Sequence, residues 1–286
     1  MKALVTGGAG FLGSHLCTRL VNEGHKVYCL DSFVTSSPKN LNRHVELIID
    51  RVDGITDLPV VDWIFHLASP AAPGDINTFK GTCLAANISG TKRMIKHAES
   101  YNAKLMFVST MKVYGQCHRV EEYITGKVAG EKLCENHKIA RLANVYGPNM
   151  RPDDSRVIPV FITKALKNEE LSLWNEGTQL DSFCYVDDII DGLMRFMLSE
   201  STGVIEFGYD DTISIAFLAD KILRLTGSKS HLITTERVTV VDICHQLADL
   251  TRARKELGWF PDTILDAGLV KTIHYFKEIL HVGKES

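Results

Sequence analysis

The feature that most constrains the fold is a glycine-rich turn close to the start of the chain. The segment TGGAGFLG, residues 6–13, joins an apolar strand expected at 2–6 to a helix expected at 11–23. Glycine lets the backbone turn tightly and approach a pyrophosphate closely, and Gly13 permits close packing of helix on sheet. The free N–H groups at the start of the helix attract an anion. The segment therefore predicts a turn that binds the phosphates of a dinucleotide.

An aspartate supports this interpretation. Asp31 follows the next strand, expected at 25–30, where a carboxylate can accept hydrogen bonds from the ribose hydroxyls of an adenosine. A carboxylate at this point also repels a 2′-phosphate, so the sequence favours NAD over NADP. The alternative is that the glycines form only a tight turn and that Asp31 is a solvated strand end.

Short β-rich runs alternate with helical runs through the first half of the chain. Beyond the elements named above, this half predicts strands at 45–49, 62–67, 104–109 and 139–145 and helices at 76–100 and 121–137. Strands that alternate with helices imply a parallel sheet covered by helices on both faces. We therefore expect an α/β fold with a doubly wound parallel sheet.

The pattern changes after Gly147 and Pro148. The second half predicts helices at 157–167, 187–198, 214–226, 251–257 and 266–280 and short strands at 171–174 and 183–186. No linker rich in Pro and Gly separates the halves, so we expect two interleaved parts. The nucleotide-binding domain is expected at 1–148 with about 181–203, and a smaller substrate lobe at 149–180 with 204–286.

Composition narrows the range of partners. The net charge is only −3, so nothing favours a nucleic acid as the main partner. We expect no membrane partner, because the start shows no signal peptide and no run of about 18 apolar residues is present. The seven cysteines include no CxxC pair, which predicts reduced, mostly buried thiols in a cytoplasmic protein. The 11 histidines form no cluster with ligand spacing, so no metal is expected.

Several motifs follow the glycine turn and Asp31 in a fixed order. They are HLASPAAP at 66–73, STMKVYG at 109–115, Tyr123-x-x-x-Lys127, ARLANVYGP at 140–148, YVDD at 185–188 and LGW at 257–259. In this order they resemble the extended short-chain dehydrogenase/reductases, a family of nucleotide-sugar epimerases, dehydratases and decarboxylases, over almost the whole chain. HLASPAAP, and LGW with residues 272–276, are most similar to UDP-glucuronate decarboxylases. The resemblance implies a Rossmann-type fold and a nucleotide-sugar substrate.

The resemblance also implies three catalytic residues. Tyr123 would be the acid/base, Lys127 would hold the nicotinamide ribose and lower the pKa of Tyr123, and Thr110 would hydrogen-bond to the reacting hydroxyl. The i, i+4 spacing places Tyr123 and Lys127 on one face of a helix. The C4 hydroxyl of the sugar would lose its proton to Tyr123 and its hydride to NAD. The alternative is a chance pair on a solvated helix.

A larger set of binding residues follows from the same resemblance. The NAD site would comprise Gly7, Gly10, Phe11, Leu12, Gly13, Asp31, Ser32, Phe33, Asp50, Leu67, Ala68, Ser69, Tyr123, Lys127 and Tyr146. The substrate would contact Thr110, Asn144, Arg156 and Trp174. The indole of Trp174 could stack on a nucleobase, although a half-buried packing role fits the sequence equally well. His66 is expected to be a packed strand-end residue rather than an acid or a ligand.

Four features depart from the family pattern. Met111-Lys112 stands where the dehydratases use an Asp-Glu pair and the decarboxylases keep a Glu, which argues against dehydration and removes a carboxylate from decarboxylation. The segment between Tyr114 and Tyr123 is shorter than usual and predicts a more open active site. Asp181 and Gln246 stand where the family carries arginines that contact the diphosphate. The candidates to replace those arginines are Arg141, Arg151, Arg156, Arg252 and Arg254.

These features leave several functions open. The closest is decarboxylation of UDP-glucuronate, in which oxidation at C4 makes a β-keto acid that loses carbon dioxide. C4 epimerisation, or a simple oxidation or reduction, depends less on a carboxylate at the position of Lys112. A weakly catalytic NAD-binding homologue with a regulatory or assembly role is the alternative from a different class. The resemblance further implies a homodimer, in which the helices expected at 76–100 and 121–137 pair with their copies.

Overall fold

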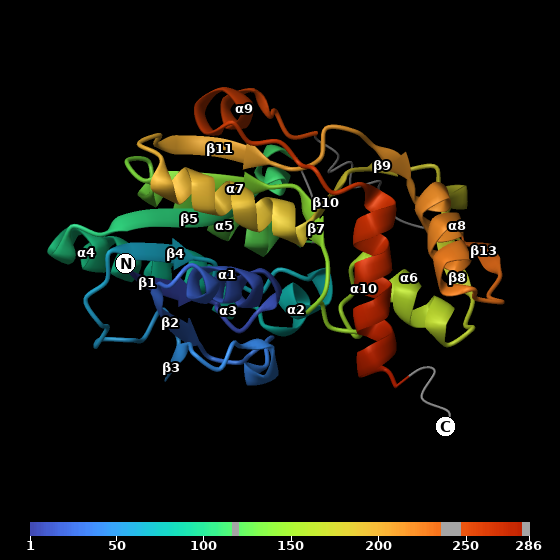
Figure 1. Cartoon of the computed structure of the whole chain (residues 1–286), viewed down its shortest axis with the longest axis horizontal. Helices are drawn as coiled ribbons and strands as arrows, with labels where there is room; N and C mark the ends of the chain where they lie inside the picture. Colours follow the sequence, from blue (N-terminus) through green and yellow to red (C-terminus); the bar gives the residue numbers. More distant parts are fainter. Residues whose placement is uncertain (116–119, 236–246, 282–286) are drawn as a thin grey trace.

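The centre of the molecule is a parallel sheet of seven strands (Figure 1). The computed structural model describes residues 1–115, 120–235 and 247–281. The strand order is β11-β6-β5-β4-β1-β2-β3, and every neighbouring pair is parallel. The strands are β1 (Lys2–Thr6), β2 (Lys26–Asp31), β3 (Glu46–Ile49), β4 (Trp63–His66), β5 (Lys104–Thr110), β6 (Lys138–Leu142) and β11 (Gly203–Phe207). The predicted doubly wound parallel sheet is confirmed.

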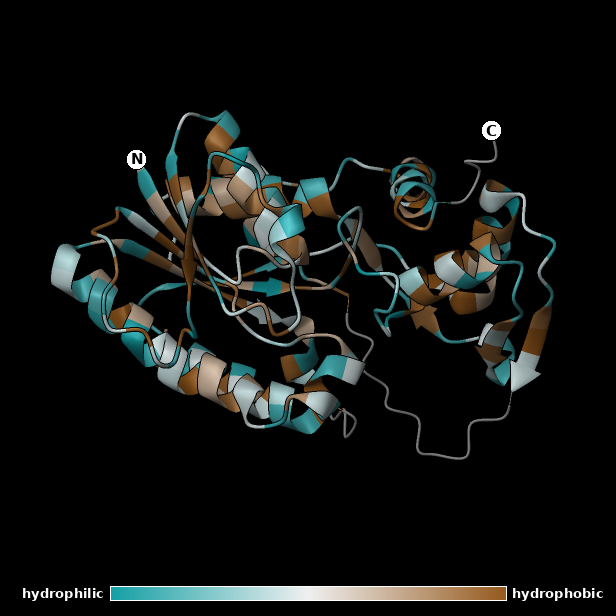
Figure 2. Cartoon of the chain, turned by 90° about the horizontal axis from the view of Figure 1, so that it is seen from below, coloured by the Kyte–Doolittle hydropathy of each residue, from teal (hydrophilic) through white to brown (hydrophobic). Residues whose placement is uncertain are grey.

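Helices cover both faces of this sheet. One face carries α1 (Phe11–Asn22) and α7 (Val186–Leu198), and the other carries α4 (Thr91–Tyr101) and α5 (Glu121–Leu133). Side chains alternate along a strand, so Val5 belongs to the core cluster that includes α1, and Leu4 belongs to the cluster that includes α4. In Figure 2 the hydrophobic strands lie between the two layers of helices. Both faces of the sheet are therefore buried, as parallel strands require.

The glycine-rich turn connects β1 to α1 as expected. Gly7 has φ +70°, a conformation that L side chains rarely adopt. A Cβ on Gly13 would lie 2.1 Å from the carbonyl oxygen of Gly7. The first turn of α1 can therefore approach the end of β1 only because position 13 has no side chain.

A smaller lobe is formed by later parts of the chain. Its elements are α6 (Val157–Leu166), β8 (Leu171–Trp174), η5 (Asn175–Gly177), β9 (Leu180–Asp181), β12 (Ile213–Ser214), α8 (Ile215–Thr226), β13 (Leu232–Thr235) and α10 (Leu265–Ile279). β8 pairs with β13, and β9 pairs with β12, so each small sheet joins distant segments. Leu16, Leu218 and Phe276 belong to one core cluster, which therefore runs from the sheet into the lobe. β11 extends the large sheet just past the expected boundary near residue 203.

The helix expected at 76–100 is wrong in its first part. α2 (Pro73–Thr78) ends early, and Gly81 with φ +77° breaks the chain direction before α3 (Thr82–Ala85) begins. A π-helical turn, η2 (Ala86–Gly90), then connects α3 to α4. The apolar periodicity continues through this region and gives no sign of the left-handed backbone conformation at position 81.

Other boundaries also differ from the sequence-based expectation. The helix expected at 121–137 ends at Leu133. The strand expected at 139–145 divides at Ala143, because its second part, β7 (Asn144–Tyr146), leaves the large sheet and pairs with β10 (Phe183–Tyr185). The remaining short elements are η1 (Pro38–Asn40), η3 (Met111–Tyr114) and α9 (Thr251–Leu257).

The cysteines in the described residues agree with the predicted buried thiols. Cys17, Cys29, Cys83, Cys134 and Cys184 are buried and free, whereas Cys117 and Cys244 lie outside the described residues. Among helices of the described ranges, none is both long and apolar enough to cross a membrane. The same ranges contain no group of three or more His, Cys, Asp or Glu side chains arranged to hold a metal ion.

Candidate active site

A cavity of about 870 Å³ lies at the carboxyl ends of β1, β2, β4 and β5. This is the edge at which open parallel sheets bind their ligands. The predicted site residues that line it are Gly7, Gly10, Phe11, Leu12, Gly13, Asp31, Ser32, Asp50, Leu67, Ala68, Ser69, Thr110, Tyr123, Lys127, Asn144 and Arg156. The structure therefore brings most of the predicted NAD and substrate residues to one continuous space.

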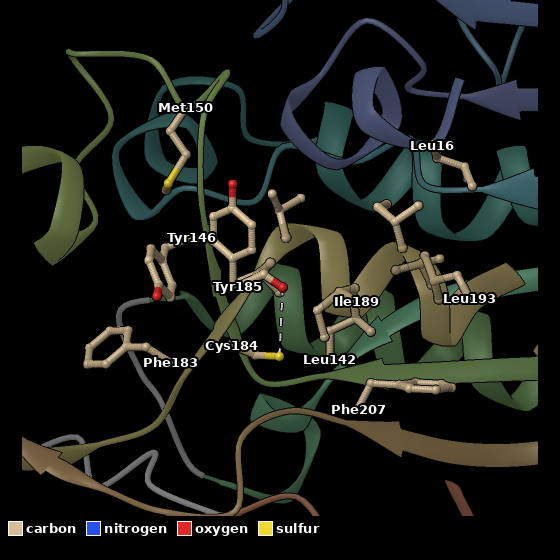
Figure 3. Packing of buried hydrophobic residues seen from close by; sticks show 14 of the residues in the cluster. Leu16, Leu142, Tyr146, Met150, Phe183, Cys184, Tyr185, Ile189, Leu193 and Phe207 are labelled. Atoms are coloured by element: carbon tan, nitrogen blue, oxygen red, sulfur yellow. Dashed lines mark hydrogen bonds between the residues drawn. The ribbon is translucent and has the colours of Figure 1, made fainter. Parts of the chain in front are cut away.

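Three predicted residues do not line this cavity. Tyr146 is buried in the core, with its hydroxyl donating to the carbonyl of Leu265 at 3.1 Å and its ring 5.7 Å from that of Tyr185 (Figure 3). Phe33 has φ +56° and packs against the large core cluster. Trp174 lies at the end of β8 with 42% of its surface exposed. Tertiary packing thus holds the ring of Tyr146 in the core, and the contacts predicted for these three residues stay predictions.

The carboxylate of Asp31 fastens the glycine-rich turn to the end of β2. It accepts hydrogen bonds from the backbone N–H of Ala9 at 3.0 Å, the N–H of Phe33 at 2.9 Å and the hydroxyl of Ser36 at 2.7 Å. Only 8% of the residue is exposed. Asp31 is therefore a fixed part of the cavity wall and not a solvated strand end.

Tyr123 and Lys127 lie on the buried face of α5. They are 8% and 3% exposed, respectively. The ammonium of Lys127 donates to the carbonyl of Val108 at 2.7 Å and lies 4.7 Å from the ring centre of Phe107. It also lies 5.7 Å from the ring centre of Tyr123. The two side chains therefore share one enclosed environment, unlike a chance pair on a solvated helix.

Burial dominates the titration of this pair. It raises the pKa of Tyr123 far above its ordinary value, and the hydrogen bond from Thr110 and the charge of Arg156 lower that pKa in part. Burial lowers the pKa of Lys127 to about 8, and the nearby Cys83 and Glu131 oppose that shift. Arg156, for which the sequence indicated only a substrate contact, is thus one positive charge that lowers the pKa of Tyr123.

Thr110, the third residue predicted to be catalytic, lies at the end of β5. Its hydroxyl accepts from the backbone N–H of Lys112 at 3.3 Å and bonds to the phenol of Tyr123. Thr110 and Tyr123 therefore meet at one point of the cavity wall. A hydroxyl of a bound substrate placed there could contact both side chains.

Two of the five arginines proposed as replacements reach the same cavity. Arg156 forms an ion pair with Asp154 at 2.5 Å, and its guanidinium lies 5.6 Å from the ring centre of Phe11. Arg151 donates to the carbonyl of Thr35 at 2.8 Å and pairs with Asp75 at 2.8 Å. The other candidate replacements do not line the cavity: Arg141, Arg252 and Arg254 pair with Glu131, Glu256 and Asp210.

A small side chamber of about 20 Å³ adjoins the main cavity. It is lined by Thr110, Met111, Lys112, Leu142, Ala143, Asn144, Asp181 and Ser182. The amide of Asn144 donates to Asp181 at 2.5 Å and to the carbonyl of Ser182 at 3.3 Å. The chamber thus gathers two of the departures from the family pattern, Lys112 and Asp181. Another departure, Gln246, lies outside the described residues.

Other residues belong to the cavity without a signal in the sequence. The end of α10 supplies Tyr275, Glu278 and Ile279, followed by His281, and the loops after β2 and β3 supply Lys39 and Arg51. Nothing in the local pattern of 265–281 indicates that this helix reaches the nucleotide site. His66, by contrast, is packed as expected: it bonds to Thr6 at 2.7 Å and Thr91 at 3.1 Å, and burial lowers its pKa to about 3.

Comparisons with known proteins agree with this geometry. Residues 3–208 match the model of the NAD dependent epimerase/dehydratase family. UDP-glucuronic acid decarboxylase 1 of Xenopus tropicalis is 34% identical over 98% of this chain and 73% of its own length. UDP-glucuronic acid decarboxylase 5 of Arabidopsis thaliana is 35% identical over 99% of this chain and 92% of its own length.

Solved structures show the same fold over nearly the whole chain. UDP-glucose 4-epimerase of Thermotoga maritima, solved with UDP-glucose, has a TM-score of 0.90 at 26% identity and covers 98% of this chain and 100% of its own. UDP-glucuronic acid 4-epimerase of Bacillus cereus, in complex with UDP-glucuronic acid and NAD, has a TM-score of 0.85 at 27% identity, with coverage of 98% and 100%.

Proposed function

Because the chain belongs to the NAD-dependent epimerase/dehydratase family, within the extended short-chain dehydrogenase/reductases, we propose that it oxidises a nucleotide sugar at C4 and acts through a 4-keto intermediate. The observation that carries this proposal is that Thr110, Tyr123 and Lys127 meet at the wall of one cavity. Residues 6–13 supply the opposite end of the same cavity. The geometry thus provides for a dinucleotide and a second molecule together.

The residues present fit NAD. Gly13 has no side chain and lies close to Gly7, which leaves the start of α1 open to a pyrophosphate. The carboxylate of Asp31 can accept hydrogen bonds from ribose hydroxyls. When bound there, NAD would supply the acceptor for a hydride from the sugar and, once reduced, the donor for its return. Tyr123 would take the proton of the C4 hydroxyl, Thr110 would orient that hydroxyl, and Lys127 would hold the nicotinamide ribose.

Decarboxylation of UDP-glucuronate is the first reaction to test. Its support is the 34–35% identity to decarboxylases over nearly the whole chain. Oxidation at C4 of a glucuronate places a ketone β to the carboxylate, so the C5–C6 bond can break with its electrons moving toward the ketone. Carbon dioxide then leaves, the resulting enolate takes a proton from solvent at C5, and the C4 ketone formed in this way would be reduced by the hydride removed in the first step.

A second candidate is C4 epimerisation with the carboxylate retained, and Lys112 favours it. Lys112 lines both the cavity and the side chamber, and no ion pair is formed by its ammonium within residues 1–115, 120–235 and 247–281. Lys112 follows Thr110 by two positions, so a sugar whose C4 hydroxyl contacts Thr110 would bring its neighbouring carbons toward the Lys112 side chain. A carboxylate held there by an ammonium is stabilised in the ground state, which slows the loss of carbon dioxide.

A homodimer and a cytoplasmic location belong to the same proposal. The dimer would form through α4 and α5, where Tyr101 and Val128 are 49% and 48% exposed. The location is supported by the five buried free thiols of the described residues.

The test is incubation of the purified protein with UDP-glucuronate, UDP-galacturonate and UDP-glucose, with products identified by NMR. A pentose product supports decarboxylation, and interconversion of the two uronates supports epimerisation. Absence of turnover with every nucleotide sugar, in protein that binds NAD, would contradict the enzyme proposal and favour the regulatory homologue.

A further inference from the structure

A row of polar side chains crosses three strands near the catalytic group. Ser109 on β5, Arg141 on β6 and Glu206 on β11 are direct cross-strand neighbours, with Arg141 in the middle. Residues in register share one face of the sheet, and here that face is covered by α5. The row therefore lies between the sheet and the helix that carries Tyr123 and Lys127.

Arg141 is bound on one side to Glu131 of α5. Its Nε donates to Oε1 of Glu131 at 2.9 Å, and its Nη2 donates to Oε2 at 2.6 Å. The hydroxyl of Ser109 donates to the same Oε1 at 2.5 Å. The side chains of Arg141 and Glu131 are only 16% and 11% exposed. This is the parallel two-point geometry that a guanidinium offers and an ammonium does not.

On its other side Arg141 is bound to Tyr114. Nη1 donates to the Tyr114 hydroxyl, and the guanidinium lies 4.6 Å from the centre of the Tyr114 ring. The hydroxyl of Tyr114 donates in turn to Oε1 of Glu206 at 2.5 Å. The second oxygen of Glu206 accepts from the backbone N–H of Asp249 at 2.8 Å. Tyr114 is thus held although much of its ring is exposed.

The two residues that Arg141 holds, Tyr114 and Glu131, are attached to the two elements that carry the proposed catalytic residues. Tyr114 ends η3, the turn that begins directly after Thr110. Glu131 follows Lys127 by one helical turn and Tyr123 by two, so all three lie on the same face of α5. The chain between Tyr114 and α5 is the segment that is shorter than in the family. Arg141 therefore links both flanks of the segment that separates Thr110 from Tyr123.

We propose that Arg141 is a positioning residue that sets the placement of Thr110 relative to Tyr123 and Lys127, by holding Tyr114 and Glu131 at once. The proposal rests on the proposed C4 oxidation, because that step needs Thr110 and Tyr123 on one hydroxyl. Catalytic groups must be held within about 0.5 Å of the productive geometry. A link across the sheet, from Arg141 to Tyr114 and Glu131, supplies that precision.

The decisive variants are Arg141→Lys, which keeps the charge but loses the two-point contact, and Tyr114→Phe, which removes only the hydroxyl link to η3. Arg195→Lys is the matched control, since Arg195 on α7 pairs with Asp191 and caps the end of α9 far from the cavity. For the first two variants we expect kcat for the nucleotide sugar to fall about tenfold or more. KM and the dissociation constant of NAD should change less than threefold, and the isotope effect with substrate deuterated at C4 should rise. The control should leave kcat unchanged.

Crystal structures of the wild-type protein and Arg141→Lys give a second readout that needs no turnover. We expect the distance between Thr110 Oγ1 and the Tyr123 phenol oxygen to increase in the variant. A variant that melts earlier but keeps both the wild-type kcat and this distance would overturn the positioning role. A wild-type protein that turns over no nucleotide sugar would contradict the proposed function instead, and the crystallographic distance would still decide the role of Arg141.

Discussion

The ammonium of Lys127 donates a hydrogen bond to the carbonyl of Val108, 2.7 Å away on the strand that ends in Thr110. This bond joins α5 to β5 at the point where the catalytic side chains meet. It satisfies one of three donors of the ammonium and leaves the others for ligands. The contact explains how a lysine can be 3% exposed beside Tyr123 and still be placed for binding.

Replacement of Tyr123 by Phe should abolish turnover without loss of the fold. The phenol is the group placed to take the C4 proton, and a general acid/base contributes about 100-fold or more. We expect kcat to fall by at least this factor, measured by NMR with UDP-glucuronate. The dissociation constant of NAD should stay within threefold. Tyr101→Phe, on the exposed side of α4, is the control. Full activity in Tyr123→Phe would contradict the assignment.

The stability of the protein should depend on pH through Lys127. Burial lowers the pKa of this residue to about 8, against about 10.5 in an unfolded chain. Between these values the unfolded state binds more protons, so stability rises with pH. The free energy of unfolding of the wild type relative to Lys127→Met should therefore rise by about 3 kcal/mol from pH 8 to pH 11. Urea titrations at several pH values measure this difference, and a flat profile would disprove the buried charge.

Substitution of Lys112 should change which product forms. If its ammonium holds the substrate carboxylate, Lys112→Met should lower kcat/KM for UDP-glucuronate about tenfold or more and leave UDP-glucose little changed. Lys112→Glu should increase the share of decarboxylated product, read from the ratio of pentose to hexuronate in NMR spectra. Lys255→Glu on the exposed side of α9 is the control. Equal selectivity in the wild type, both Lys112 variants and the control would show that Lys112 does not contact the substrate.

The glycine turn should not tolerate a methyl group at position 13. A Cβ there would lie 2.1 Å from the Gly7 carbonyl oxygen, and backbone must move to relieve the contact. We expect Gly13→Ala to lower the free energy of unfolding by about 1–3 kcal/mol and to weaken NAD binding, measured by denaturation and calorimetry. Gly54→Ala, whose nearest neighbour would be 3.8 Å away, should be nearly neutral. Wild-type affinity in Gly13→Ala would count against the turn as the phosphate site.

The oligomeric state can be tested on α5. Val128 is 48% exposed on the helix through which we propose the dimer to form. A carboxylate in a buried apolar interface is costly, so Val128→Glu should sediment as a monomer where the wild type sediments as a dimer. A monomeric wild-type protein at micromolar concentration would refute the dimer.

Local pattern was sufficient to predict the sheet and the helix that carries Tyr123 and Lys127. Strands that alternate with helices identify the parallel sheet, and the i, i+4 spacing of Tyr123 and Lys127 places both on the buried face of α5. The same reasoning misplaced Tyr146, because a tyrosine that follows a strand can turn either to a cavity or to the core. Here the backbone carbonyl of Leu265, far along the chain, takes its hydroxyl.

The contributions of distant segments could not be predicted. The end of α10 reaches the cavity because α10 packs on the lobe and on β10, a relationship that no short motif encodes. The break at Gly81 was missed for a different reason, since a left-handed residue interrupts a helix without interrupting its apolar periodicity. Arg141 was visible in the sequence only as one of several charges, and its role depends on the register of β5, β6 and β11.

The pairing of β8 with β13 has a consequence for how such a chain can diversify. Because β8 pairs with β13 and β9 pairs with β12, and both pairs are formed by segments on either side of β11 in the sequence, the lobe cannot be excised or exchanged as one continuous segment. Removal of residues 204–286 would leave β8 without its partner β13, and β6 without its partner β11. Single replacements around the cavity leave this interleaved architecture intact, and the role that we propose for Lys112 is a change of this kind.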